Sequence, residues 1–391
     1  MKVNPSGGLP GSLVLEDTTL RDGEQAPGVA FSPQIKHKIV DALIRAGVKS
    51  IEVGIPAIGG DELTYLSEVA ERQDEARLIP WNRGVREEVT ASLDLGFKAV
   101  HIGLPASDLH LSSSVGKDRG WLLKTARDLV SYAKDRGAFV SISAEDLART
   151  DPSFLADYAN TVHQAGADRL RLSDTVGMLT PEGYGQRVAA VAQASDIDLQ
   201  CHAHNDFGLA VANTLAGIWA GARYFHVTIN GIGERAGMAD LAQIATTMKY
   251  LYGIDLGVKL EMLAELSQIV GQASRHEPTP WHPIVGHNVF AHESGIHVNA
   301  MLKDTSSFEP FPPEQVGGQR RYVLGKHSGR ALIRHVLEDN SRPYDDDVLW
   351  ECLRQTRALA TAEGREVSPD ELLSIHSAFT PKPGQPPATG D

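Results

Sequence analysis

The chain has 391 residues, 42% of them hydrophobic, which is enough for one large domain of roughly 250 residues and a smaller one. With 50 acidic residues against 37 basic ones, its formal net charge of -13 argues against nucleic acid or an anionic membrane as the main partner. Two cysteines, Cys201 and Cys352, are too few for a disulfide framework and fit a reducing cytosol.

No targeting segment or membrane span is visible in the sequence. The N-terminus lacks the apolar run of a signal peptide. The longest apolar stretches, such as 211–220, are interrupted well short of the ~20 residues that a membrane span needs. We therefore expect a soluble cytoplasmic protein.

Short apolar runs rich in β-branched residues alternate with longer amphipathic stretches up to about residue 250. Helix-period segments such as 33–46, 121–136 and 207–220 end at Gly47, Gly137 and Gly221, where a helix C-cap often falls. The alternation of short strands with helices favours a (β/α)8 TIM barrel. The predicted strands, in chain order, are 13–17, 50–54, 77–81, 99–103, 138–143, 168–172, 197–201 and 224–229.

A doubly wound open sheet is the main competing architecture. It would need a phosphate-binding motif after the first strand, whereas Gly231-Ile-Gly233 follows the eighth strand and lacks the full dinucleotide spacing. We therefore predict a barrel over residues 1–252 and a small mixed or helical C-terminal region over 253–378, with helices near 345–362 and 368–378. Residues 379–391, rich in proline and glycine, are expected to be a disordered tail.

A polar cluster directly follows the first predicted strand and reads Asp17-Thr-Thr-Leu-Arg-Asp-Gly-Glu-Gln25. In a (β/α)8 barrel the catalytic groups lie at the carboxyl ends of the strands. Three carboxylates, an arginine and a glycine at such a point indicate an active site. The alternative is a solvated loop with a surface ion pair.

The seventh predicted strand ends in Cys201-His-Ala-His-Asn-Asp206. Residues two apart in a strand share a face, so His202 and His204 could bind one metal ion. A lone histidine is more often a structural residue, but a pair at this spacing favours a metal. Two imidazoles and a carboxylate leave positions open for a substrate and suit Mn²⁺, Zn²⁺, Fe²⁺ or, with waters, Mg²⁺.

Two further clusters are weaker signals. Asn230-Gly-Ile-Gly-Glu-Arg-Ala-Gly237 follows the eighth strand and could offer a close backbone approach and an amide oxygen, or could be a tight turn. His292-Glu-Ser-Gly-Ile-His297 lies beyond the barrel. It could supply an acid or base near neutral pH, or could belong to a His-rich loop.

Together these segments resemble the metal-dependent condensing enzymes of the isopropylmalate synthase and homocitrate synthase family. The Asp17–Gln25 motif is also similar to that of the wider barrel group of hydroxymethylglutaryl-CoA lyase. The resemblance runs from about residue 13 to residue 330 and looks closest to homocitrate synthases associated with nitrogenase cofactor assembly. Further matching stretches are Leu20–Phe31, Glu52–Ala57, Ala144–Asp146 and Leu324–Gly329.

The resemblance implies a role for each candidate site residue. The implied metal ligands are Asp22, His202, His204 and Asn230. The implied catalytic residues are Arg21, Glu145 and His297, and the implied substrate-binding residues are Arg21, Ser143 and Thr175. The resemblance also implies a divalent metal (Mg²⁺, Mn²⁺ or Zn²⁺) and acetyl-CoA as cosubstrate. It implies a homodimer in which the histidine segment, within the C-terminal region, reaches the partner subunit's barrel and completes its active site.

The implied reaction is an acyl transfer, in which acetyl-CoA condenses with a 2-oxo acid and the thioester is then hydrolysed. Homocitrate synthesis from 2-oxoglutarate is the first expectation. Phe308 stands where many members have tyrosine, Met238 replaces a common asparagine, and Ser141 stands where lysine-pathway homocitrate synthases place an arginine for the distal carboxylate. The alternatives are therefore 2-oxoisovalerate, pyruvate, oxaloacetate or a phosphono or phosphino analogue of oxaloacetate.

An acyl-CoA lyase on the same barrel is a more distant alternative. Such lyases usually carry a cysteine-bearing loop near the end of the barrel, and the region after the eighth strand holds no cysteine here. A catalytically dead binding protein would have lost a ligand, and all the expected ligands remain. The basic side chains that could meet an anionic substrate tail are Arg83, His101, His110, Lys117, Arg119 and Arg171, and spacing alone does not rank them.

Overall fold

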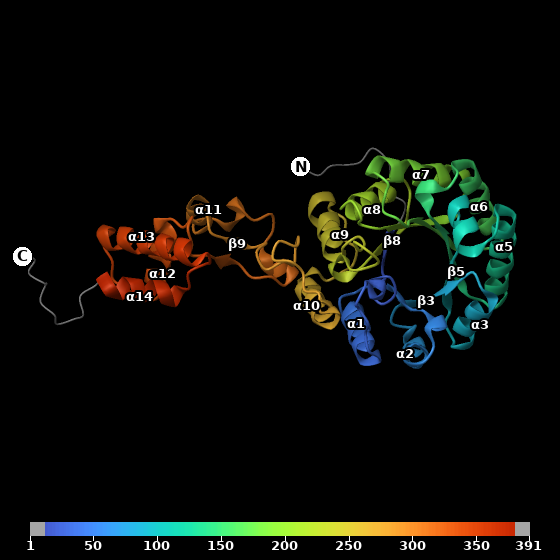
Figure 1. Cartoon of the computed structure of the whole chain (residues 1–391), viewed down its shortest axis with the longest axis horizontal. Helices are drawn as coiled ribbons and strands as arrows, with labels where there is room; N and C mark the ends of the chain where they lie inside the picture. The colour runs from blue at the N-terminus through green and yellow to red at the C-terminus, as the bar shows by residue number, and fades with distance from the viewer. Residues whose placement is uncertain (1–11, 380–391) are drawn as a thin grey trace, which may run out of the picture. The chain divides into compact units, whose positions relative to one another are not determined.

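The computed structural model describes residues 12–379, which begin with a closed barrel of eight parallel strands (Figure 1). The strands follow one another in chain order, and β8 pairs back to β1, so the sheet has no open edge. This closure confirms the (β/α)8 prediction and excludes the doubly wound sheet. The strands are β1 (Val14–Asp17), β2 (Ser50–Gly54), β3 (Arg77–Arg83), β4 (Ala99–Gly103), β5 (Phe139–Glu145), β6 (Arg169–Asp174), β7 (Asp198–Ala203) and β8 (Tyr224–Val227).

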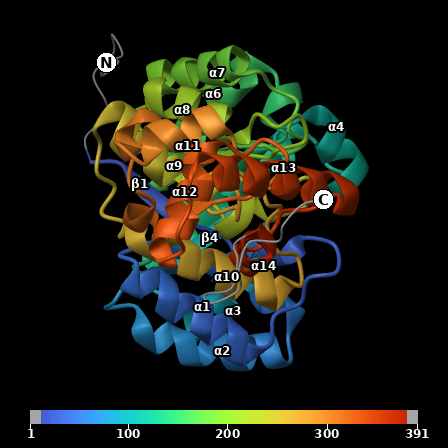
Figure 2. The same ribbon diagram turned by 90° about the vertical axis from the view of Figure 1, so that its left-hand side faces the viewer.

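Helices surround the barrel, and Figure 2 shows α2 and α7 on opposite sides of it. Gly47, Gly137 and Gly221 follow helix ends with positive φ, as predicted for C-caps. No helix within residues 12–379 is long and apolar enough to cross a membrane. The helices of this part are α1 (Pro33–Arg45), α2 (Asp61–Val69), α3 (Arg86–Asp94), α4 (Asp108–His110), α5 (Arg119–Asp135), α6 (Pro152–Gln164), α7 (Pro181–Ala194), α8 (Ala210–Trp219), α9 (Leu241–Thr247) and α10 (Leu263–Ser274).

The interior of the barrel is filled by charged and polar side chains rather than by aliphatic ones. Along β2 and β6, alternate residues point inward, so Glu52 and Arg171 meet inside the barrel while Ile51 and Leu170 pack on its outer side. The Glu52 carboxylate accepts a hydrogen bond of 2.7 Å from Arg171, and both side chains are buried. The aliphatic core of the barrel therefore lies between the strands and the helices.

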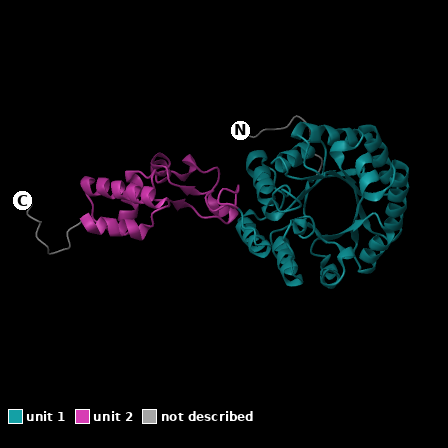
Figure 3. Cartoon of the chain, viewed as in Figure 1, with its two compact units in different colours: residues 1–278 teal, residues 279–391 magenta. Residues whose placement is uncertain are grey.

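The chain divides into two compact units, residues 1–278 and 279–391 (Figure 3). The first unit runs beyond the expected boundary at residue 252, because α10 packs against α1 and Glu265 pairs with Arg45 at 2.7 Å. The expected disordered tail over 379–391 lies, except for Phe379, outside the described residues.

The second unit has its own hydrophobic core, built from residues such as Val298, Leu332 and Leu353. Its two longest helices match the helices predicted near 345–362 and 368–378. Its elements are β9 (Ala291–His292), α11 (Gly295–Met301), β10 (Arg321–Tyr322), α12 (Arg330–Asp339), α13 (Asp346–Glu363) and α14 (Pro369–Phe379).

Candidate active site

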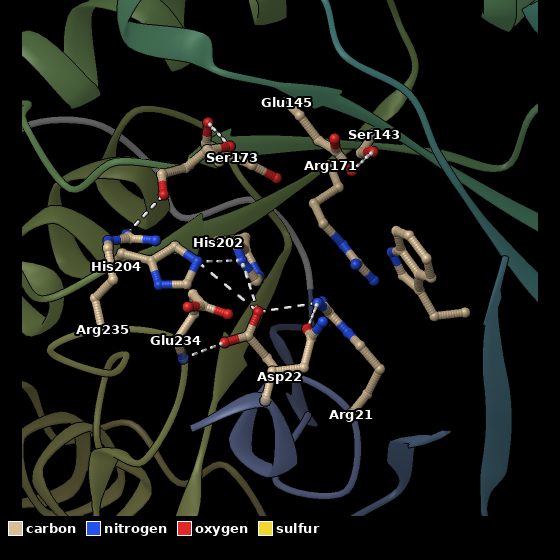
Figure 4. A pocket seen from close by; sticks show the side chains of 13 residues that line it. Arg21, Asp22, Ser143, Glu145, Arg171, Ser173, His202, His204, Glu234 and Arg235 are labelled. Atoms are coloured by element: carbon tan, nitrogen blue, oxygen red, sulfur yellow. Dashed lines mark hydrogen bonds and ion pairs between the residues drawn. The ribbon is translucent and has the colours of Figure 1, made fainter. Parts of the chain in front are cut away.

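A cavity of about 230 Å³ is lined by side chains from the carboxyl ends of the barrel strands and from the turns that follow them (Figure 4). Apart from Asn230, the barrel residues expected at the site lie on or directly after four strands, β1, β5, β6 and β7, and all seven of them line this one cavity. The lining residues are Arg21, Asp22, Gln25, Trp81, Ser143, Glu145, Arg171, Ser173, Thr175, His202, His204, Glu234 and Arg235.

Asp22, His202 and His204 form a compact group in the cavity wall (Figure 4). Oδ2 of Asp22 lies 3.6 Å from Nε2 of His202 and 3.8 Å from Nε2 of His204, and the two Nε2 atoms are 3.2 Å apart. The group forms because β1 and β7 are the two neighbours of β8 in the closed barrel. All three side chains are buried.

The donor set of this group fits a divalent metal ion. Two ligand atoms that lie about 2.1 Å from one ion, at angles between 90° and the tetrahedral value, are about 3.0–3.4 Å apart, and the two imidazole nitrogens match this spacing. The turn after β8 leaves room for the carboxylate, since a Cβ on Gly233 would come within 2.8 Å of Oδ1 of Asp22. Asp22, His202 and His204 could therefore hold an ion and leave positions open for a substrate.

Burial favours the neutral form of the His202 ring. Desolvation and the neighbouring His204 and His226 rings hold the pKa of His202 well below its usual value. A neutral imidazole offers a lone pair to a metal, whereas an imidazolium does not. The site is therefore ready to bind an ion without first losing a proton from His202.

Buried ion pairs hold the Arg21 guanidinium in place. Nε of Arg21 donates to Glu52 at 2.5 Å, and Nη1 of Arg21 donates to Asp22 at 2.9 Å. Burial alone would raise the pKa of Glu52, but the charges of Arg171 and Arg21 hold it well below its ordinary value. Burial also lowers the pKa of Arg171 to about 10, which leaves its guanidinium charged at neutral pH. Both arginines therefore present positive charge to the cavity.

Glu145 ends β5 at the cavity wall and has a different environment from Glu52. Burial raises its pKa, and the charges of Arg21 and Arg171 only partly oppose that shift. The hydroxyl of Ser143 donates to Glu145 at 3.4 Å, a long hydrogen bond that leaves the carboxylate weakly held. A partly buried carboxylate with a raised pKa is a stronger base than a solvated one, as proton abstraction requires.

The hydroxyl of Thr175 lies in the turn after β6 and accepts a hydrogen bond from the backbone N–H of Asp146 at 2.9 Å. Because this contact uses a lone pair, the proton of the hydroxyl remains available for an anionic ligand. The hydroxyl donates that proton to the carbonyl of Ser173 only at 3.4 Å, a long hydrogen bond that an anionic ligand would replace. Ser143 and Ser173 add two further hydroxyls to the same wall.

Asn230, the fourth implied metal ligand, lies in the turn after β8. Its side-chain N–H donates to the carbonyl of Ser267 in α10 at 2.9 Å, and Asn230 is not among the cavity-lining residues. Its φ is 60°, and its amide oxygen, the atom that would bind a metal, is buried and has no hydrogen-bond partner among the described residues. Met238, which was noted as a departure, is buried beside this site: its backbone bridges His204, and its Cγ would lie 3.1 Å from a Cβ on Gly233.

His297 belongs to the second unit, on the exposed side of α11. Its ring stacks on Phe308, with ring centroids 4.0 Å apart and an interplanar angle of 26°. The residue that replaces the family's tyrosine is therefore the direct neighbour of the expected acid or base.

Several residues of the site were not predicted from the sequence. Of the basic side chains considered for an anionic tail, only Arg171 lines this cavity, while Arg83 and His110 line a neighbouring one. The interior residues Glu16 and His226 were missed. The available signal was a polar residue at every second position of an otherwise apolar strand, as in Arg169-Leu-Arg171.

The chain is similar to known proteins over most of its length. The HMGL-like family matches residues 12–270, and the homocitrate synthase post-HMGL domain-like family matches residues 284–364. The chain is 65% identical to 2-phosphonomethylmalate synthase of Streptomyces rubellomurinus, over 93% of this chain and 98% of the relative. It is 40% identical to homocitrate synthase 1 of Nostoc sp., over 93% and 96%. Homocitrate synthases were expected to be nearest, yet the Streptomyces relative is considerably more similar.

Among solved structures, the chain resembles the HMG-CoA lyase of Bacillus subtilis, with a TM-score of 0.62 and 18% identity. The match covers 96% of the lyase but 70% of this chain. At this identity the likeness shows the barrel fold alone.

Proposed function

The chain belongs to the HMGL-like family, within its homocitrate and isopropylmalate synthase group, and we propose on this basis that it condenses acetyl-CoA with phosphonopyruvate. The substrate assignment rests on the 65% identity to 2-phosphonomethylmalate synthase, compared with 40% identity to homocitrate synthase 1. This proposal replaces 2-oxoglutarate, the first expectation, by the phosphono analogue of oxaloacetate.

The substrate follows from the structure of the relative's product. In 2-phosphonomethylmalate, C2 of malate carries a phosphonomethyl group. Removing the acetate-derived CH2–COO⁻ arm from C2 leaves phosphonopyruvate, a 2-oxo acid. The balanced reaction joins acetyl-CoA, phosphonopyruvate and water to give 2-phosphonomethylmalate and free CoA.

The charges of the cavity support an anionic substrate with two acidic ends. A phosphonate, like a phosphate monoester, carries nearly two negative charges at neutral pH, and the carboxylate adds a third. Arg21 and Arg171 present guanidinium groups to the cavity, and Thr175 has a hydroxyl proton available for a carboxylate oxygen. Ser173 can donate to a remaining oxygen, and so can Ser143 when its hydroxyl turns from its long contact with Glu145.

A divalent metal held by Asp22, His202 and His204 would polarise the carbonyl of the oxo acid as a Lewis acid. Arg21, bonded to Asp22, lies where it would stabilise the negative charge that develops on the carbonyl oxygen. Glu52 holds the Arg21 guanidinium in this orientation through its own hydrogen bond.

Glu145 is the group we assign to proton abstraction from the methyl group of acetyl-CoA. The electron pair of the broken C–H bond forms the new C–C bond to the carbonyl carbon, and the oxygen takes up a proton. Water then cleaves the thioester and releases CoA, which drives the reaction forward. His297, the other implied acid or base, would act from the second unit of a homodimer partner.

The synthase assignment is preferred to a lyase because of the second unit. The lyase matched above is almost fully covered by the barrel of this chain, whereas residues 284–364 match the domain that follows the barrel in homocitrate synthases. A protein that only cleaved acyl-CoA on the barrel would not require this segment.

A thiol-release assay tests the proposal. Acetyl-CoA is mixed with phosphonopyruvate, 2-oxoglutarate, 2-oxoisovalerate, pyruvate or oxaloacetate in the presence of Mg²⁺, Mn²⁺ or Zn²⁺, and CoA release is followed with a thiol reagent. We expect the highest kcat/KM with phosphonopyruvate and a product with the mass of 2-phosphonomethylmalate. If 2-oxoglutarate is used best, the substrate assignment is wrong but the reaction class stands. If no oxo acid releases CoA, the synthase assignment fails.

A further inference from the structure

A chain of hydrogen bonds leads from the metal-binding group into the barrel interior through His226. Nδ1 of His202 lies 2.8 Å from Nδ1 of His226, and Nε2 of His226 lies 2.7 Å from a carboxylate oxygen of Glu16. His226, on β8, and Glu16, on β1, are both fully buried. The second nitrogen of His202 is therefore occupied by another imidazole, which is itself held by a carboxylate.

The direction of each hydrogen bond follows from Glu16. One of its oxygens faces Arg169 at 2.6 Å, Gln200 at 3.0 Å and His226, and the other accepts from Ser50 at 2.5 Å. An ionised carboxylate only accepts hydrogen bonds, so Nε2 of His226 carries a proton and donates it.

The His226 ring is neutral by charge balance. Glu16 and Glu52 are already matched by the guanidinium groups of Arg169, Arg171 and Arg21, and a further buried cation would have no partner of its own. A neutral imidazole with a proton on Nε2 has a bare Nδ1, which accepts. Nδ1 of His202 must then carry the proton and donate.

This assignment leaves Nε2 of His202 with its lone pair directed at Asp22 and His204, as a metal ligand requires. His204 differs: its Nδ1 is buried and has no hydrogen-bond partner among the described residues. The two histidines of the site therefore differ in the partner of Nδ1. Only His202 has a second imidazole as its hydrogen-bond partner.

We propose that His226 is a positioning residue that, oriented by Glu16, fixes the ring and the tautomer of His202 so that Nε2 is presented to the metal. The inference rests on the metal site of the proposed function. It adds that residues of the barrel interior orient the His202 ring before the metal ion binds. Partners of metal-bound histidines typically contribute about 10- to 100-fold in metal affinity.

The experiment compares His226→Phe, which cannot accept a hydrogen bond, with His226→Asn, whose amide oxygen can replace Nδ1 as an acceptor. His101→Phe is the matched control. His101, on β4, is also fully buried in the barrel, but it bonds to Ser141 and not to a residue of the metal-binding group. Co²⁺ and Zn²⁺ affinities are measured by competition with a chromophoric chelator. The Co²⁺ absorption spectrum reports the ligand geometry, and thermal melting of the metal-free proteins reports the fold.

We expect His226→Phe to weaken Co²⁺ binding by about 10- to 100-fold and to change the spectrum. His226→Asn should restore most of the affinity, and His101→Phe should bind as the wild type does. Wild-type affinity and spectrum in His226→Phe would overturn the inference, as would an Asn variant as weak as the Phe variant. If the wild type itself binds neither metal, the metal site of the proposed function fails instead.

A second measurement needs no folded variant at position 226. In metal-free wild-type protein labelled with ¹⁵N-histidine, the His202 signals are identified by their loss in His202→Asn. We expect the proton on Nδ1 and a lone pair on Nε2. A proton on Nε2 of His202 would contradict the proposed tautomer of His202, even if His226→Phe fails to fold.

Discussion

The carboxylate of Asp22 lies 3.6 Å from Nε2 of His202, although Asp22 follows β1 and His202 lies on β7, far apart in the barrel sequence. Only the pairing of β8 with both β1 and β7 brings them together. If this contact marks a metal site, loss of either side chain should remove the ion and the activity together.

We expect Asp22→Ala to lose bound divalent metal and CoA release while keeping its fold. Only the imidazoles of His202 and His204 would remain as ligands, and two imidazoles alone hold an ion weakly. Metal content after dialysis is measured by mass spectrometry beside the thiol-release assay. His37→Ala in α1, which removes a partly exposed histidine paired with Glu68, is the control and should keep both. A metal-loaded, active Asp22→Ala protein would contradict the site.

Glu145→Gln should lower kcat by about 10²- to 10⁴-fold with metal content unchanged, because the amide cannot accept the methyl proton. Since burial raises the pKa of Glu145 above 4.5, kcat/KM of the wild type should increase with pH through that raised value as the carboxylate ionises. The Gln variant should lose this rise. Glu182→Gln, at an exposed position of α7, should behave as the wild type does. An unchanged kcat in Glu145→Gln would assign the proton transfer elsewhere.

Gly233→Ala should weaken metal binding without unfolding the barrel. A Cβ at this position would come within 2.8 Å of Oδ1 of Asp22 and 3.1 Å of Cγ of Met238, so the carboxylate must move. Gly120→Ala in α5, where the nearest atom would be 3.4 Å away, is the matched control. Chelator competition and thermal melting are measured for both. Equal metal affinity in the two variants would show that the turn after β8 does not shape the site.

Asp17 should make the protein less stable as pH rises from about 4 to about 7. Burial raises the pKa of Asp17 from 3.8 to about 7, so in this window the folded protein holds a proton that the unfolded chain has released. Its contribution to the free energy of unfolding has its full value below pH 3.8. Above that pH the contribution falls by up to about 1.4 kcal/mol per pH unit until pH about 7. Denaturant titrations of Asp17→Asn and wild type should therefore diverge across this window.

The comparison with Asp17→Asn is needed because the buried Glu16 and Glu52 carboxylates, whose pKa values are lowered, oppose the trend in the whole protein. Asp157→Asn, at an exposed position of α6, serves as the control. If the Asp17→Asn and wild-type profiles stay parallel from pH 4 to pH 7, Asp17 does not titrate as expected.

Subunit mixing should test whether His297 completes the partner subunit's site. Asp22→Ala and His297→Ala should each be inactive as pure proteins. After co-expression, random pairing would leave one intact site in each mixed dimer and recover about a quarter of the wild-type activity. Asp22→Ala mixed with Glu145→Gln should recover none, since both changes lie in the barrel. An active His297→Ala protein, or mixed dimers without activity, would contradict this arrangement.

Much of the fold follows from local patterns. Short β-branched runs and glycines after helices identified all eight strands and several helix ends, because strand and helix periodicity are local properties of the chain. The two-residue spacing of His202 and His204 likewise determined that both point to one face. The family motif after the first strand identified Asp22 as their partner.

The sequence by itself therefore determined the barrel, the order of its strands and the residues of the candidate metal site, Asp22, His202 and His204. Only the tertiary structure decided which interior side chains meet across the closed barrel: Glu52 with Arg171, and Glu16 with His226. It also showed that the side-chain N–H of Asn230 bonds to α10. Periodicity tells which face a side chain occupies, but contacts between distant strands depend on barrel closure and register, which no local stretch encodes.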